Sequence, residues 1–194
     1  FVVFSPEIFI QTDFPYIFSH PMKGTIDANV PDAAKKILGN AKEQAEHATI
    51  VDLIRNDLSM ISGNVTVEKY RYIDKLRTNQ KTLLQVSSKI SGKLSHDFYR
   101  FLGDMLWAIL PAGSISGAPK NKTLDIIRQA ELCERGYYTG IFGVFDGKNL
   151  DCGVMIRFIE NNSALAGFLN KTFIHVSLSQ KKHTFVFRSG GGIT

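Results

Sequence analysis

The fold of this chain is decided by residues 31–58, PDAAKKILGNAKEQAEHATIVDLIRNDL. Apolar residues recur there at three- and four-residue spacing, at Ile37, Ala41, Ala45, Ala48, Val51, Ile54 and Leu58. This spacing places them along one face of a helix. Aspartate is a good N-cap residue, so Pro31-Asp32 is a suitable start. The pattern predicts one long helix from Pro31 to Leu58.

Segments with strand composition lie on both sides of this helix. Phe1 to Ile10 precedes it, and Val65 to Tyr72 and Leu83 to Leu94 follow it. Pro21 to Thr25 is expected to be a turn. Beyond these, the patterns predict helices at 97–110 and 120–130, a loop at 111–119, and strands at 138–145, 152–159, 173–178 and 184–188. The last four form two hairpins, and the whole is a mixed α+β fold that we expect to form one domain over residues 1–194.

Composition points to an ordinary soluble globular protein. Hydrophobic residues make up 44% of the 194 residues and charged residues 21%, which is typical of a protein with a sizeable core. The net charge of +5 comes from dispersed basic residues, and no nucleic-acid-binding module is visible, which argues against a nucleic-acid partner. A modest basic excess also suits an enzyme whose substrate is a small anion.

The cysteine residues indicate the cellular compartment of the protein, and the chain ends indicate how much of it this sequence contains. Cys133 and Cys152 have neither metal-ligand nor redox spacing, and no apolar run is long enough to span a bilayer, so we expect a cytoplasmic protein. The chain starts without methionine and stops directly after Gly190 to Thr194. We therefore expect it to be the interior of a longer protein, incomplete at both ends.

The segment Pro21-Met22-Lys23-Gly24-Thr25 presents an amine beside a glycine and a hydroxyl. Glycine lets a substrate approach the backbone, and a partly desolvated lysine can act as a nucleophile. The alternative is a surface turn with a solvated lysine, which is the commoner situation.

Two carboxylates on the long helix suggest a metal site. Glu43 and Glu46 are three residues apart and therefore share a face, and His47 follows. Such a pair can hold Mg²⁺, which prefers oxygen ligands. The alternative is an ordinary solvated helix surface. Further along, Asp52 and Arg55 are expected to belong to a structural salt-bridge network at the end of the helix.

Anions have several candidate binding positions. Residues 113–120, GSISGAPK, lack the spacing of a phosphate loop but could bind an anion at the start of the following helix. The backbone of Gly190-Gly191-Gly192 could receive a carboxylate on a strand edge. Tyr138 and Arg157 are carboxylate partners, with a structural salt bridge as the alternative for Arg157.

The order of these motifs resembles the chorismate-utilising enzymes, which include anthranilate, aminodeoxychorismate, isochorismate and salicylate synthases. The resemblance runs from Ser5 to Ile193 and rests on eight motifs in register: Ser5-Pro6-Glu7, Pro21 to Thr25, Glu43 to His47, Val51 to Leu58, Pro111 to Lys120, Arg135 to Gly140, Ile156-Arg157 and Gly190 to Ile193. It implies that family's α/β sandwich, with two large antiparallel sheets and helices outside.

Within the family, the lysine at position 23, in the Pro-x-Lys-Gly-Thr motif, resembles component I of the aminodeoxychorismate synthases. That resemblance implies amination of chorismate at C4 to 4-amino-4-deoxychorismate, on the route to p-aminobenzoate and folate. Lys23 would be the covalent nucleophile and Glu7 the general acid/base. An amidotransferase subunit would supply ammonia from glutamine. The alternatives are an anthranilate synthase component I, an isochorismate- or salicylate-type synthase, and a non-catalytic binding module.

The resemblance also implies roles for the remaining candidates. Glu46 would be a Mg²⁺ ligand, with Glu43 acting near the metal through water. The residues that would bind substrate are Gly24, Thr25, Gln85, Tyr138, Arg157, Gly190, Gly191 and Gly192. Gln85 stands where family members commonly have a histidine, and Phe158 replaces a hydroxyl residue often found after the Ile-Arg pair.

Overall fold

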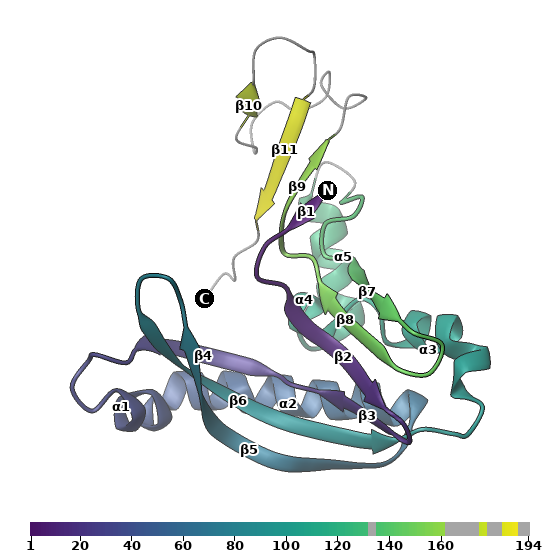
Figure 1. The fold of residues 1–194 in the computed structure, drawn as a ribbon, viewed down its shortest axis with the longest axis horizontal. Helices are drawn as coiled ribbons and strands as arrows, with labels where there is room; N and C mark the ends of the chain where they lie inside the picture. Colours follow the sequence, from purple (N-terminus) through teal and green to yellow (C-terminus); the bar gives the residue numbers. More distant parts are fainter. Residues whose placement is uncertain (132–134, 162–174, 178–183, 190–194) are drawn as a thin grey trace.

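A computed structural model of the chain describes residues 1–131, 135–161, 175–177 and 184–189 (Figure 1). Its strands are β1 Val2–Val3, β2 Glu7–Asp13, β3 Tyr16–Ser19, β4 Met22–Asp27, β5 Gly63–Arg77, β6 Thr82–Lys93, β7 Ile141–Phe145, β8 Leu150–Val154, β9 Arg157–Asn161, β10 His175–Ser177 and β11 Thr184–Ser189. Its helices are α1 Ala33–Gly39, α2 Ala41–Ile61, the 3₁₀ helix η1 Phe98–Phe101, α3 Leu102–Ile109, α4 Gly113–Ser116 and α5 Lys120–Ala130.

The described strands form two antiparallel sheets. The larger has the order β4-β6-β3-β2-β8-β7, with β5 also paired to β6. The smaller has the order β1-β9-β11-β10. The prediction of a mixed α+β fold with two antiparallel sheets is therefore confirmed. The pairing of β10 with β11 and of β7 with β8 confirms both expected hairpins.

Two stretches of chain connect the sheets directly. The first runs from β1 through Ser5 into β2, and the second runs from β8 through Met155 and Ile156 into β9 (Figure 1). At this junction the Phe4 N–H donates to the Arg157 carbonyl at 2.9 Å. The predicted strand 152–159 is thus two strands, because the chain changes sheets at its middle.

The predicted long helix is two helices, α1 and α2. The break falls at Asn40, whose extended backbone ends α1 and whose side-chain oxygen accepts a hydrogen bond from the Glu43 N–H at 3.1 Å. An N-cap of this kind satisfies one of the free amides at the start of a helix. Asp32 does lie at the N-cap position of α1, but its side chain makes no capping bond.

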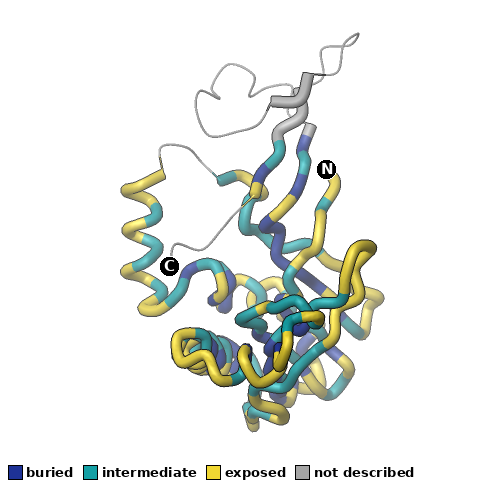
Figure 2. Tube along the Cα trace, turned by 90° about the vertical axis from the view of Figure 1, so that its left-hand side faces the viewer, coloured by how far each residue is buried: buried dark blue, intermediate teal, exposed yellow. Residues whose placement is uncertain are grey.

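Helix α2 packs on the large sheet and carries much of the core. Its buried residues include Val51 and Leu58, and the sheet contributes Ile17 and Ile90, which are fully buried. Figure 2 shows buried positions inside the body of the molecule and exposed positions along the outer helices. Helix α5 has no buried residue at all, so it covers the fold only at its rim.

The segment Pro21 to Thr25 is mostly strand, which corrects the expected turn. Met22 pairs with Ser87 and Thr25 with Gln85, so three residue steps on β4 face two on β6. This β-bulge places an extra residue between the two pairs. Gly24 lies at its centre with φ at 86°, a backbone conformation that glycine adopts at little cost.

Helical boundaries differ from the prediction at two other places. The predicted helix 97–110 begins as η1 before continuing as α3, and the predicted loop 111–119 contains the short helix α4. Residues 138–140 precede β7 rather than belong to it. No single helix in the described ranges is long and apolar enough to cross a membrane.

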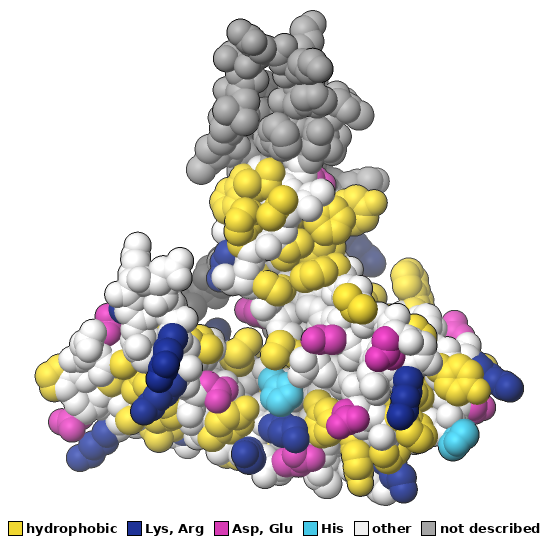
Figure 3. Space-filling view, in the orientation of Figure 1, with side chains coloured by type: hydrophobic (Ala, Val, Ile, Leu, Met, Phe, Trp, Pro, Cys, Tyr) yellow, Lys and Arg dark blue, Asp and Glu magenta, His cyan; other side chains and the backbone are white. Residues whose placement is uncertain are grey.

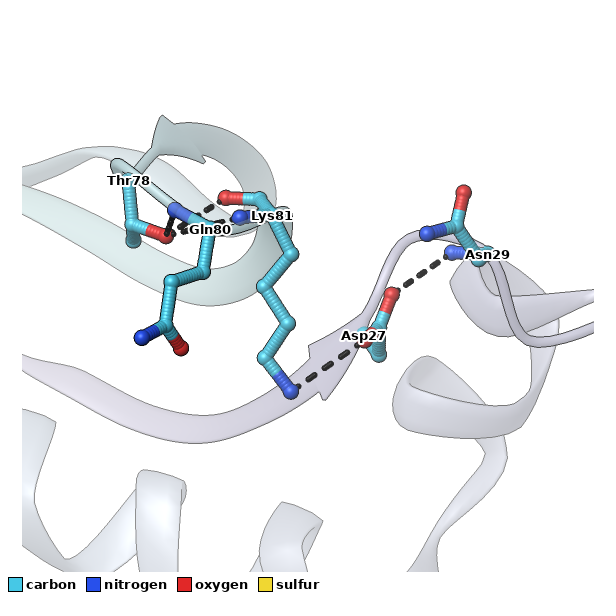
Figure 4. A network of polar contacts seen from close by, with 5 residues as sticks. All are labelled: Asp27, Asn29, Thr78, Gln80 and Lys81. Atoms are coloured by element: carbon cyan, nitrogen blue, oxygen red, sulfur yellow. Dashed lines mark hydrogen bonds and ion pairs between the residues drawn. The ribbon is translucent and has the colours of Figure 1, made fainter.

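A polar network fixes the end of β4 that is remote from the bulge (Figure 4). Asp27 accepts the Asn29 N–H at 3.0 Å and pairs with Lys81 Nζ at 3.2 Å. Thr78 Oγ1 donates to the Lys81 carbonyl at 2.7 Å in the turn between β5 and β6. This turn is therefore tied to β4 by charge as well as by backbone pairing.

Surface charge is mixed on the face shown in Figure 3. Lys and Arg side chains alternate with Asp and Glu over the large sheet, and hydrophobic side chains gather higher up, below the undescribed residues. The exposed apolar residues include Phe1 and Tyr137, whose ring centroids lie 6.0 Å apart. This face carries no continuous basic stripe.

Candidate functional site

Lys23 and Glu46 meet between the bulge of β4 and helix α2. Lys23 Nζ lies 2.8 Å from Glu46 Oε2, and Lys42 Nζ lies 3.9 Å from Glu46 Oε1. The hydrogen bond from Lys23, its charge and the charge of Lys42 lower the pKa of Glu46. Glu46 is therefore an ionised carboxylate with a cation near each oxygen.

Gly24 and Glu43 lie beside this pair. A Cβ at Gly24 would stand 3.2 Å from Glu43 Oε2, so the backbone at the bulge passes directly under that carboxylate. Glu43 Oε2 is buried and has no hydrogen-bond partner. A buried carboxylate oxygen without a partner is costly, and its position next to Glu46 makes it a ready acceptor for a cation or a bound water.

The two carboxylates fit the group that the resemblance implies. Mg²⁺ is usually held by one or two protein carboxylates together with waters and substrate, and Glu43 and Glu46 offer such a pair on one face of α2. Among the described residues, no three or more His, Cys, Asp and Glu side chains converge as a fuller metal centre. The site thus fits a cation that takes its other ligands from water and substrate.

Thr25 and Gln85 close one side of the group. They face each other across β4 and β6, and Gln85 Nε2 lies 3.5 Å from Thr25 Oγ1. At this length the hydrogen bond is weak, so both polar side chains remain available to a ligand. The structure accordingly brings six of the sequence-predicted residues together: Lys23, Gly24, Thr25, Glu43, Glu46 and Gln85.

Behind the carboxylates, His47 ties α2 to the sheet. It is fully buried, and its Nε2 lies 2.7 Å from Ser88 Oγ, which also accepts the Arg71 N–H at 2.9 Å. Burial, and secondly the Arg71 charge, lower the pKa of His47, so the ring is neutral at pH 7. No local sequence pattern indicates Ser88 as the partner of His47, because it lies 41 residues away in β6.

Glu7, Arg157 and Tyr138 lie in a second group at the junction of the sheets. Glu7 begins β2 and pairs with Val154. Arg157 begins β9, and its Nη1 lies 3.5 Å from the Ser5 carbonyl. Tyr138 stacks on Phe158 with ring centroids 6.5 Å apart. Arg157 is exposed, and it forms no ion pair with any other described residue.

One cavity reaches from the second group toward the first. It has a volume of about 40 Å³ and is lined by Glu7, Met22, Asp57 and Ser114, among others. This volume holds a few water molecules. The cavity thus extends from Glu7 to Met22, the residue before Lys23, but Lys23 itself does not line it. No hydrogen bond or ion pair joins the two groups within the described residues.

Lys120 and Asp57 form a structural pair that the sequence did not predict. Lys120 Nζ donates to Asp57 Oδ1 at 2.9 Å, to Asp57 Oδ2 at 3.0 Å and to the Ile109 carbonyl at 3.1 Å. The only charged side chain of the 113–120 motif is thereby engaged, so the lysine is not an anion ligand. The two partners lie 63 residues apart, and no local pattern relates them.

The remaining predicted residues divide in two. Asp52 and Arg55 form an exposed pair at 3.5 Å, but they lie in the middle of α2, which continues to Ile61, and not at a helix end. Gly190, Gly191 and Gly192 lie outside the described residues. Strand β11 leads toward them and places Ser189 opposite Arg157.

Comparison with known proteins identifies relatives of this arrangement. The model of the chorismate binding enzyme family matches residues 1–169. An uncharacterized PabA-like protein of Haemophilus influenzae is 53% identical over the whole chain, which covers 53% of that protein. The chain spans about half the length of the relatives it matches most strongly.

More distant relatives have named activities. The aminodeoxychorismate synthase component 1 of Bacillus subtilis is 35% identical over 80% of the chain and 33% of its own length. The anthranilate synthase component 1 1 of Haloarcula marismortui is 36% identical over 80% of the chain and 33% of its own length. Identity alone therefore does not separate these two activities.

A solved structure of the same kind superposes on the chain. The crystal structure of anthranilate synthase component I from Streptococcus pneumoniae has a TM-score of 0.66 at 30% identity, over 80% of this chain and 34% of that one. Sequence, family model and fold agree, and the chain belongs to the chorismate binding enzyme family.

Proposed function

We propose that the protein containing this chain aminates chorismate at C4 with ammonia, giving 4-amino-4-deoxychorismate and water. The observation that carries the proposal is the amine of Lys23, which lies on a bulge beside Thr25 and pairs with the Glu46 carboxylate, with Glu43 next to Gly24. The similarity to the aminodeoxychorismate synthase of Bacillus subtilis supports it.

The proposed reaction has two displacement steps. The Lys23 ammonium first gives a proton to water; the resulting neutral amine attacks C2 of chorismate, the ring double bonds shift, and the C4–O bond breaks. The departing hydroxyl takes a proton from Glu7 and leaves as water. Ammonia then attacks C4, the double bonds shift back, and the C2–N bond to Lys23 breaks. Covalent catalysis thus divides one difficult displacement into two easier ones.

Other side chains hold the substrate in this proposal. Tyr138 and Arg157 receive a carboxylate of chorismate at the junction of the sheets, where Arg157 is exposed and its contact with the Ser5 carbonyl is long at 3.5 Å. The backbone of Gly24 and the hydroxyl of Thr25 contact the ring substituents, and Gln85 donates from β6. Glu46, assisted by Glu43, holds Mg²⁺, which neutralises and orients the ring carboxylate when bound.

The proposal also implies a partner and a place in the cell. Ammonia must come from glutamine hydrolysis or from solution, so a glutamine amidotransferase subunit or domain is the expected partner. Chorismate is an intracellular metabolite, and we propose a cytoplasmic enzyme.

The test is a product analysis with the intact protein, chorismate, ammonium and Mg²⁺. We expect a product with the mass of aminodeoxychorismate. Lys23→Ala should reduce its rate about a thousandfold or more and abolish the mass adduct that chorismate forms with the wild-type protein. Lys42→Ala, the neighbouring exposed lysine, is the matched control and should keep both.

Two results would change the conclusion. Anthranilate with free pyruvate as the product would assign the protein to the alternative activity in the same family. An absence of turnover by the intact wild-type protein would favour a binding module.

A further inference from the structure

In the proposed site, the Glu46 carboxylate is a binding partner for two different cations. Glu46 is the proposed Mg²⁺ ligand, and its Oε2 also accepts from Lys23 Nζ at 2.8 Å. Lys23 is also the proposed nucleophile. An ammonium bound to Oε2 takes one acceptor position of this carboxylate and neutralises its charge, so it would disfavour a cation held by the same oxygen.

Glu43 is in the opposite situation. Its Oε2 is buried and unpartnered, although it lies only one helical turn from Glu46 and 3.2 Å from the Cβ position of Gly24. The bulge explains the difference, because it directs the Lys23 side chain to Glu46 and brings only backbone beneath Glu43. One carboxylate of the pair is thus open to a cation and the other is closed by a lysine.

We propose that Lys23 and the divalent cation compete for Glu46, so that binding of the cation displaces the Lys23 ammonium and releases it toward the substrate. This rests on the proposed function, in that it takes Glu46 as a metal ligand. The order of events follows: the cation binds before Lys23 is free to react. Lys23 thus stays paired with Glu46 until the cation binds to that carboxylate.

The strength of the ion pair suits such an exchange. The side chains of Lys23 and Glu46 are 40% and 30% exposed, and ion pairs with this access to water contribute little. A doubly charged cation held by both glutamates therefore displaces the lysine readily. The Lys120–Asp57 pair, with side-chain exposures of 20% and 12%, has less access to water and would exchange less readily.

The experiment measures metal affinity in the intact protein without chorismate, using Mn²⁺ and electron paramagnetic resonance, with Mg²⁺ as the competing ion. Lys23→Met removes the competing charge and should tighten binding roughly three- to tenfold. Lys23→Arg keeps a cation opposite Glu46 and should stay within about twofold of wild type. Lys42 Nζ lies 3.9 Å from the same carboxylate. Lys42→Met should therefore tighten Mn²⁺ binding less than Lys23→Met does.

Glu46→Gln separates this inference from the proposed function. Tight binding that is lost in Glu46→Gln but is unchanged in Lys23→Met would overturn the competition and leave the metal site standing. If Glu46→Gln binds Mn²⁺ as tightly as the wild-type protein, both the metal assignment and the competition are overturned. The amination assay is independent of either result, because it is scored on product mass and on the Lys23 adduct.

Discussion

Asp57 and Lys120 form the most enclosed ion pair that joins two helices in the described part of the chain. Burial raises the pKa of Asp57, while the hydrogen bond and charge of Lys120 act against that rise. Lys120 also donates to the Ile109 carbonyl, so one ammonium links α2, the end of α3 and the start of α5. Removing one partner of such a pair leaves an unpaired buried charge.

Lys120→Met is therefore expected to destabilise the protein by about 2–4 kcal/mol at pH 7. The free energy of unfolding that is lost in Lys120→Met should become smaller as the pH falls. Asp57 has a folded-state pKa above its unfolded value of 3.8, so the folded state binds the proton more readily, and a protonated Asp57 needs no cation. Urea unfolding at pH 4 to 8 measures this, with Lys122→Met on the exposed face of α5 as control. An equal loss at every pH would contradict it.

Cys152 is predicted to be chemically inert in the folded protein. Burial raises the pKa of its thiol to about 11, so at pH 8 only about one molecule in a thousand carries the reactive thiolate. Native protein treated with iodoacetamide should leave Cys152 unlabelled, and protein in urea should be labelled fully; peptide mass spectrometry distinguishes the two. Rapid labelling without denaturant would show that strand β8 opens readily.

At the scale of the elements, the bulge in β4 is what places the lysine. Gly24 has φ at 86° and sits 3.2 Å, measured from a Cβ position, from Glu43 Oε2. Gly24→Ala should cost about 1–2 kcal/mol, because a residue with a Cβ is strained in that region. It should also displace Glu43 and weaken Mn²⁺ binding.

Gly39→Ala is the matched control for the bulge. It lies at the end of α1 with nothing within 4 Å of its Cβ position, so it should be neutral in both thermal unfolding and metal affinity. Equal effects of the two substitutions would mean that the backbone conformation at Gly24 does not position the site.

The helix and strand periodicities predicted most elements, and the misses have local physical causes. The repeat from Ile37 to Leu58 correctly indicated helix, but it continued through Asn40, where a capping side chain starts a new helix in place of an interior residue. Pro21 to Thr25 looked like a turn because proline and glycine are common in turns. In the sheet, Gly24 instead supplies the positive φ of a bulge.

The arrangement of the site was less accessible to sequence. The i, i+3 spacing of Glu43 and Glu46 predicted a shared face, which α2 provides. That Lys23 would pair with Glu46, or Ser88 with His47, depends on how β4 and β6 pack against α2. Such contacts between distant segments have no local pattern, so only the family resemblance suggested that Lys23 and the glutamates belong together.

At the scale of the whole molecule, the proposed site would include residues at two sheets, between which the chain crosses twice. Lys23, Gln85 and the glutamates belong to the large sheet and its helix, whereas Arg157 and Tyr138 lie where the sheets meet. A substrate bound by both groups would hold the sheets in one relative position. The junction should therefore matter for substrate binding as well as for stability.

Substitution of Phe158 tests whether the junction of the two sheets unfolds separately from the large sheet. Its side chain is fully buried at the start of β9 and stacks against Tyr138. Phe158→Ala should destabilise the protein by about 3–5 kcal/mol, as expected for a large buried side chain. Phe101→Ala, which removes a ring that is 53% exposed, should cost less than about 1 kcal/mol.

Hydrogen exchange locates the damage caused by Phe158→Ala. The two sheets are connected by the crossings at Ser5 and at Met155-Ile156, and the core of the large sheet is built on α2, Ile17 and Ile90. Loss of the Phe158 ring should therefore increase exchange in β1, β9 and residues 138–140 and leave β5 and β6 protected. Equal loss of protection in β6 and β9 would mean that both sheets open together, and the junction would then be part of one cooperative core.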